Sequence, residues 1–202
     1  MTRWRFYQNL ITLLSVSLAL AGCDYFASPA HRDSPVTARD FLLDESAFPA
    51  NWRVGYLYAV PPGKAGYAGE EALELEFRGP ILPEGQDGAG QAVYRFRNAA
   101  LAASSYKRMQ NDIIFFGETD DSGKHPENWR YRSSVADDWR FACDLSGCGV
   151  IARYDEFVLS FSASMTTPSM TPAALETVFK AIDQRMTEKL GKPPATPTAS
   201  TK

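Results

Sequence analysis

Side chains alternate between apolar and polar along most of the interior of this chain, and this alternation constrains the fold more than any other feature. It is typical of a β-strand with one buried face, because successive side chains of a strand point to opposite sides. The pattern predicts strands at residues 52–59, 72–78, 91–97, 129–132, 139–143, 150–154 and 157–165. The tight connections between the last of these segments favour antiparallel neighbours.

Two segments show the helical period instead. Asn98 is placed to begin a helix that ends near residue 112. Thr171 with Pro172 begins a longer helix, which is expected to end at Gly191. A shorter helix is expected over about residues 36–43. The order of elements predicts an α+β fold, in which about two main helices pack on one face of an antiparallel sheet. This order is similar to that of the PsbP- and Mog1-type folds.

Composition excludes several classes of protein. The 202 residues are 45% hydrophobic and 22% charged, which is an ordinary globular balance with room for one domain. The net charge of -3 gives no reason to expect nucleic acid as a partner. Three cysteines and two histidines are too few for a structural zinc cluster, so neither a metal site nor a cofactor is predicted.

The first residues have the layout of a secretory signal peptide. Arg3 and Arg5 precede ITLLSVSLALAG, a run that contains no charge. A helix that crosses a membrane needs about 20 apolar residues. The run is shorter than that, because Asp24 follows it closely. We therefore expect this segment to be removed after export.

The apolar run ends in Leu20, Ala21, Gly22 and Cys23, which resembles the lipobox of bacterial lipoproteins. The resemblance implies cleavage before Cys23, which then carries diacylglycerol and usually an amide-linked chain such as palmitate. Several acyl chains anchor a protein stably, whereas one alone does not. The resemblance therefore places the protein at the cell membrane, on its extracytoplasmic side. An ordinary secreted protein with a chance cysteine is the alternative.

These patterns divide the chain into four parts. Residues 1–22 are the predicted lipoprotein signal peptide, and residues 23–35 form a tether rich in Ser, Pro and Ala. Residues 36–191 are predicted to form a single α+β domain. Residues 192–202 are rich in Pro, Thr and Ala and are predicted to be disordered.

Cys143 and Cys148 remain as a pair once Cys23 is assigned to lipid. They bracket a turn-rich tetrapeptide between two predicted strands, so their side chains can meet across the mouth of a hairpin. On the oxidising side of a membrane we expect a disulfide. A redox site is the alternative, but the spacing is not that of a C-x-x-C motif.

Arginine is frequent at the polar positions of the predicted strands. If the apolar side chains face the helices, seven arginines share the opposite face of the sheet: Arg53, Arg95, Arg97, Arg130, Arg132, Arg140 and Arg153. Guanidinium groups bind phosphate and carboxylate with paired hydrogen bonds, so such a face could bind an anionic headgroup, a glycan or an acidic protein. The alternative is a solvated face on which Glu and Arg pair across strands.

No arrangement of residues points to a particular enzyme. His31 lies in the tether, His125 precedes Pro126 in an acidic loop, and there is no G-x-S-x-G motif. The sequence therefore predicts a lipid-anchored extracytoplasmic binding or assembly module without catalysis. The alternative is a small envelope hydrolase with a carboxylate-based site. A deep pocket with convergent Asp and Glu would favour the enzyme, and a shallow surface would favour binding.

Overall fold

The fold is seen in a computed structural model that describes residues 35–61, 69–82, 85–112, 126, 129–143, 147–165 and 170–191. All of these belong to one unit, Arg32–Lys202. The predicted signal peptide, Cys23 and the predicted tail lie outside the described residues. So does the predicted tether, apart from Pro35.

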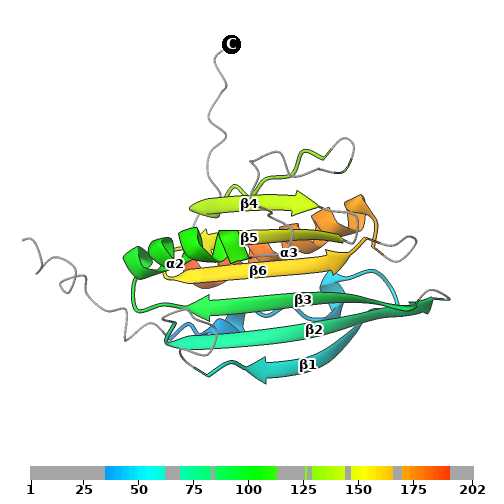
Figure 1. Cartoon of the computed structure of the whole chain (residues 1–202), viewed down its shortest axis with the longest axis horizontal. Helices are drawn as coiled ribbons and strands as arrows, with labels where there is room; N and C mark the ends of the chain where they lie inside the picture. The colour runs from blue at the N-terminus through cyan, green and yellow to red at the C-terminus, as the bar shows by residue number, and fades with distance from the viewer. Residues whose placement is uncertain are drawn as a thin grey trace, which may run out of the picture. The chain divides into compact units, whose positions relative to one another are not determined.

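Six strands of the described part form one antiparallel sheet in the order β1-β2-β3-β6-β5-β4 (Figure 1). The strands are β1 (Arg53–Ala59), β2 (Glu71–Leu82), β3 (Gly85–Arg95), β4 (Asp138–Cys143), β5 (Gly147–Tyr154) and β6 (Phe157–Ser164). Six of the predicted strand segments therefore fall on observed strands, and the α+β class is confirmed. The likeness of the element order to the PsbP- and Mog1-type folds stays a prediction.

Two α-helices of the described part lie on opposite faces of this sheet (Figure 1). Helix α3 (Pro172–Leu190) covers one face, called here the α3 face, and α2 (Ala99–Asp112) covers part of the other, the α2 face. The prediction that both helices pack on one face is therefore wrong. The reason is visible in β5, where Val150 packs with the α3 cluster and the next residue, Ile151, packs with the α2 cluster. A strand with apolar side chains on both faces needs cover on both sides.

Helix α3 begins and ends where the sequence predicts. The Thr171 hydroxyl accepts a 3.2 Å hydrogen bond from the Ala174 amide, and Pro172 is the first helical residue. Gly191 ends the helix with a φ of 64°, a left-handed conformation that glycine adopts without steric cost. The side chains that α3 buries against the sheet include Leu175, Val178, Phe179, Ile182 and Met186.

Two 3-10 turns replace the short helix expected near the start of the domain. They are η1 (Ala38–Phe41) and η2 (Glu45–Ala47). The buried side chain of Gln91 holds this segment against β3, because it accepts a 2.8 Å hydrogen bond from the Leu43 amide and donates one of 2.9 Å to the Phe41 carbonyl.

Residues 129–132 alternate as predicted but belong to no strand within the described part of the chain. Their aromatic side chains pack instead on α3, where the Trp129 and Tyr131 rings lie 5.8 and 6.3 Å from the Phe179 ring. The strand prediction was wrong here because alternation reports which side chains are buried, whereas a strand also needs a neighbour to pair with. No helix that the structure describes is both long and apolar enough to cross a membrane.

Candidate functional site

Three of the seven predicted face arginines lie on the α2 face. Arg53 on β1 is paired opposite Arg78, while Arg140 and Arg153 are on β4 and β5. Since β1 and β4 are the two edges of the sheet and neighbouring strands are about 4.8 Å apart, Arg53 and Arg140 are separated by roughly 24 Å. Arg153 is engaged within the fold by a 2.6 Å ion pair with Asp138.

The other four arginines lie elsewhere. Arg95 is on the α3 face, with its guanidinium carbon 5.9 Å from the centre of the Phe157 ring. Arg97, Arg130 and Arg132 are exposed in connections outside the strands. The expectation of one seven-arginine face is therefore wrong in its geometry, because β3 has apolar side chains on both faces and its register puts Arg95 on the α3 side. Anion binding by any of these arginines stays a prediction.

The predicted disulfide is present between Cys143 and Cys148. The two residues are directly paired across the β4–β5 hairpin, with their Cα atoms 4.0 Å apart. Both side chains pack with the cluster under α3. The disulfide therefore links two neighbouring strands next to the hydrophobic core.

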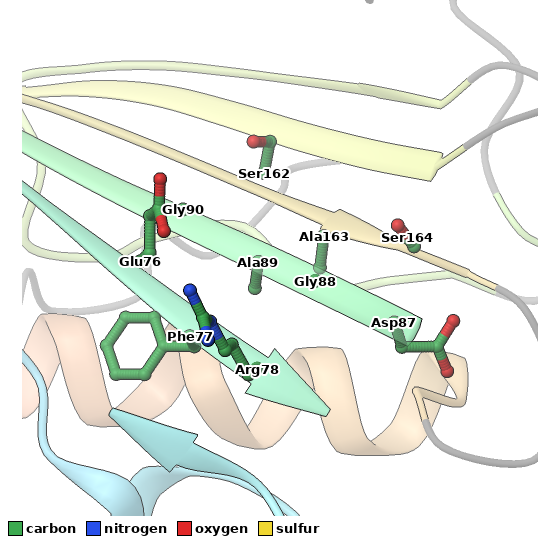
Figure 2. Close-up of a pocket in the computed structure, with 10 residues that line it drawn as sticks. All are labelled: Glu76, Phe77, Arg78, Asp87, Gly88, Ala89, Gly90, Ser162, Ala163 and Ser164. Atoms are coloured by element: carbon green, nitrogen blue, oxygen red, sulfur yellow. The ribbon is translucent and has the colours of Figure 1, made fainter. Parts of the chain in front are cut away.

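A pocket of about 460 Å³ opens at one end of the sheet, over β2, β3 and β6 (Figure 2). Helix α2 packs on a different part of the same face, over Tyr94, Ile151 and Val158. The residues that line the pocket are Glu76, Phe77, Arg78, Asp87, Gly88, Ala89, Gly90, Ser162, Ala163 and Ser164. We call it the β2–β3–β6 pocket.

Polar side chains form two walls of this pocket. Glu76 and Arg78 come from β2, and Ser162 comes from β6. Gly90 lies between the walls, because the register pairs it with Glu76 on one side and with Ser162 on the other. Directly opposed residues of antiparallel strands point to the same face, so the carboxylate and the hydroxyl both project from the α2 face.

Two exposed tyrosines of β1 border the β2 wall. Tyr56 is 55% exposed and Tyr58 is 46% exposed, and their ring centres lie 6.1 Å apart. The Arg78 guanidinium lies 4.6 Å from the centre of the Tyr56 ring, within the range of a cation–π contact. Desolvation of its hydroxyl and the neighbouring Glu76 carboxylate raise the pKa of Tyr58 above its ordinary value. The tyrosines therefore lie beside the β2 wall, towards the sheet edge and outside the lining of the pocket.

The second carboxylate of the pocket does not converge with the first. Asp87 lies two positions before Ala89 on β3 and in phase with Gln91 and Val93, so its side chain shares their face, the α3 face. The Glu76 side chain points to the α2 face. Figure 2 shows Asp87 directed away from Glu76. Asp87 is also buried, with 6% of its surface exposed. The two carboxylates are not arranged as a pair for acid–base catalysis.

A third acidic side chain lies inside the fold. Asp183 of α3 accepts hydrogen bonds from the hydroxyls of Tyr131 at 2.7 Å, Ser133 at 2.7 Å and Tyr154 at 2.8 Å. Burial, followed by the interaction with Asp183, raises the pKa of both tyrosines well above the ordinary value. Because Asp183 is buried and its oxygens already accept these bonds, we interpret the cluster as part of the folded core.

Among the described residues, no three or more His, Cys, Asp or Glu side chains are grouped so that they could hold a metal ion. Comparison with protein-family models found no match, and comparison with curated proteins found none either. Among solved structures, the chain is similar to the extracellular domain of PknH from Mycobacterium tuberculosis, with 15% identity and a TM-score of 0.39. That similarity covers 75% of this chain and 97% of the PknH chain.

The pocket could not be predicted from the side-chain pattern, because residues 79–90 are rich in Gly and Pro and resemble a connection between strands. In the structure, β2 continues to Leu82 and β3 begins at Gly85. Glycine is depleted in strands and hides the alternation, so the pattern ended too early. One signal was present: Gly88, Gly90 and Ala92 are small residues at every second position, in phase with the strand that follows.

Proposed function

We propose that this protein is a lipid-anchored binding module on the extracytoplasmic side of the bacterial cell membrane, and that it binds its partner at the β2–β3–β6 pocket. The observation that carries the proposal is the pocket itself, an opening on the sheet face between the polar side chains of Glu76 and Arg78 and the hydroxyl of Ser162. An open, preformed recess with a few converging polar groups is the usual form of a binding site.

The proposed location is supported by the lipobox-like sequence that ends at Cys23 and by the disulfide between Cys143 and Cys148. Disulfides persist on the oxidising side of a membrane and are rare in the cytosol. Removal of residues 1–22 would delete two arginines and no acidic residue, which makes the remaining chain more acidic. Net charge would then not attract the protein to an anionic bilayer, so the acyl chains would provide the anchor.

Binding is favoured over catalysis by the directions of the acidic side chains. Glu76 and Asp87 point to opposite faces of the sheet, and Asp183 is enclosed by hydroxyl groups. A carboxylate-based hydrolase needs two carboxyl groups on either side of one scissile bond. Among the described residues that line the pocket, Glu76 is the one carboxylate on its open side.

Two measurements test the proposal. The first is the mass of the native protein, which should show that the chain begins at an acylated Cys23. The Cys23→Ser variant should keep its leader. An unmodified thiol at Cys23 in the native protein contradicts the anchor. The second is sedimentation of the purified full-length protein with detergent-washed cell envelopes. We expect Gly90→Leu to reduce this retention and Gly90→Ala, which leaves most of the pocket open, to reduce it much less. Equal retention of both variants contradicts a role for the pocket.

A further inference from the structure

The floor of the β2–β3–β6 pocket is open because two strand residues have no side chain. A Cβ atom built at Gly90 would lie 3.9 Å from its nearest neighbour, the Ser162 Oγ, and one at Gly88 would lie 3.8 Å from the Phe77 carbonyl oxygen. Both distances are ordinary contacts. By contrast, a Cβ at Gly147 would lie only 2.4 Å from the Ala163 carbonyl oxygen. Packing among the described residues therefore explains Gly147 but not Gly88 or Gly90.

Glycine in the middle of a strand lowers stability, because it loses more backbone entropy on folding and has no side chain to pack. Gly88 and Gly90 both occupy such positions in β3. A strand glycine with free space above it is a place where a ligand can approach the backbone closely. Gly88 and Gly90 therefore leave room for a ligand against the β3 backbone, and the side chains around them indicate which ligand fits.

The β2 wall and the neighbouring strand β1 together present flat aromatic surfaces and paired polar groups. The Tyr56 and Tyr58 rings are about half exposed, and the Glu76 carboxylate and the Arg78 guanidinium lie beside them. A sugar ring has an apolar face of C–H groups that can pack on an aromatic ring, and neighbouring hydroxyls that can bond to both oxygens of a carboxylate or to two guanidinium nitrogens. The Ser162 hydroxyl on the opposite wall both donates and accepts.

Among the described residues, the charges around the pocket are balanced. Arg78 is accompanied by Glu76 on the same wall, and outside the pocket Arg53 and Glu74 add one charge of each sign to the same face. A polyanion would therefore meet carboxylates as well as a guanidinium, and would gain little from electrostatic attraction. This balance favours an uncharged ligand over an anionic one.

We propose that the β2–β3–β6 pocket, together with Tyr56 and Tyr58, binds an uncharged oligosaccharide. Part of the oligosaccharide would pack on the two tyrosines, and another part would cross the glycine floor beside Glu76 and Ser162. The pocket is open along the sheet face, which suits a polymer that passes through it better than a small ligand that must be enclosed. This inference rests on the proposed function, because it names the ligand class of the same site.

The test is isothermal titration calorimetry of the full-length acylated protein in detergent micelles with a β-1,4-linked tetramer of N-acetylglucosamine. We expect the unmodified protein to bind this probe. Tyr56→Ala and Glu76→Gln should each weaken binding about fivefold, and Gly90→Leu by more than about tenfold. Glu176→Gln is the matched control for Glu76→Gln, since Glu176 is on α3 behind the opposite face, and it should leave the affinity unchanged. Circular dichroism and urea unfolding verify that each variant is folded.

Three results would overturn the inference: no heat of binding with the tetramer, equal affinity of the unmodified protein and Gly90→Leu, or tighter binding of polygalacturonate, an anionic polysaccharide, than of the tetramer. The proposed function has its own readout. If envelope retention is lost in Gly90→Leu while the tetramer does not bind, the pocket binds something other than this class of sugar. If retention is unchanged as well, both proposals are wrong.

Discussion

The Tyr154 hydroxyl, at the end of β5, donates a 2.8 Å hydrogen bond to Asp183 Oδ1 in α3. The same carboxylate accepts the hydroxyls of Tyr131 and Ser133, each at 2.7 Å. The Asp183 side chain of α3 is therefore hydrogen-bonded both to the sheet and to the segment that precedes β4. The Ser133 hydroxyl continues the network, because it also accepts from the Ala136 amide at 2.8 Å.

Replacement of Asp183 should destabilise the fold strongly. Asp183→Ala removes the shared acceptor of three hydroxyls, of which Tyr131 keeps a 3.3 Å hydrogen bond to the Phe179 carbonyl. The loss of these hydrogen bonds to a buried carboxylate should cost about 3 kcal/mol of unfolding free energy. Urea unfolding measures the change. Glu188→Gln on the exposed side of α3 is the control and should change stability by less than about 0.5 kcal/mol. A loss below about 1 kcal/mol for Asp183→Ala would contradict this account of the cluster.

Stability should also fall at alkaline pH. Burial and the Asp183 carboxylate raise the pKa of Tyr154 in the folded state, while an exposed tyrosine titrates near pH 10. The neutral Tyr154 phenol therefore contributes fully to the free energy of unfolding below about pH 10, and this contribution is lost as the pH rises through and beyond that value. As the pH rises from 8 to 11, the urea unfolding midpoint should fall less steeply for Tyr154→Phe than for the unmodified protein, although the variant is less stable at pH 8. Parallel curves for the two proteins would show that Tyr154 is not the group responsible.

At acid pH the fold should lose stability, in part because interactions in the η1 and η2 turns are lost. Hydrogen bonds from the backbone and side chain of Thr37 lower the pKa of Asp40, and bonds from Ser46 and Arg185 lower the pKa of Asp44. An Asp carboxyl whose pKa is lowered by folding stabilises the fold at pH values above its ordinary pKa of about 3.9. This stabilisation is lost as the pH falls through the pKa that the carboxyl has in the folded state. Asp40→Asn should therefore reduce stability by about 0.5 kcal/mol at pH 7 and by nearly nothing at pH 2. Urea unfolding at the two pH values measures the difference, and an equal loss at both would contradict it.

Two glycines of the β2–β3 hairpin should respond in opposite ways to alanine. At Gly79, a Cβ would lie 2.9 Å from the Asp87 Cβ and 3.0 Å from the Trp52 ring, so Gly79→Ala should cost about 1 to 3 kcal/mol through overpacking. At Gly90 the space is free, and alanine restricts the unfolded chain, so Gly90→Ala should change stability by about 0 to +1 kcal/mol. Thermal unfolding of the pair measures both. Equal destabilisation would mean that the floor of the pocket is not open.

Removal of the disulfide should have a modest effect. In the chain-entropy model, closing so short a loop contributes about 2 kcal/mol, so the double replacement of Cys143 and Cys148 by Ser should lower the unfolding free energy by about that amount. Reducing agent should have the same effect on the unmodified protein and none on the double variant. A protein that is equally stable with and without reductant would show that the link does not contribute.

Much of the secondary structure could be predicted because its causes are local. Thr171 and Gly191 mark the ends of α3 through hydrogen bonds and a backbone angle that involve only their neighbours. The link between Cys143 and Cys148 depends on a short hairpin between adjacent strands. The inward stripe of α3, with Leu175 and Phe179, follows from helical spacing alone.

The pocket and its walls could not be predicted in the same way. Gly90 lies between Glu76 and Ser162 only because β3 pairs with β2 on one side and with β6, far along the chain, on the other. The cluster around Asp183 likewise joins residues that are about fifty positions apart. No local pattern reports such distant partners.

What the sequence alone determined is therefore most of the strands, the two described α-helices and several of their ends, because these depend on contacts within one or two turns of chain. Tertiary structure decided that α2 and α3 cover opposite faces, that Arg95 lies apart from Arg53, and that a hollow opens over Gly88 and Gly90. The physical reason is the two-residue repeat of a strand: a register shift of one residue moves every side chain to the other face, and the register is set by distant pairing partners.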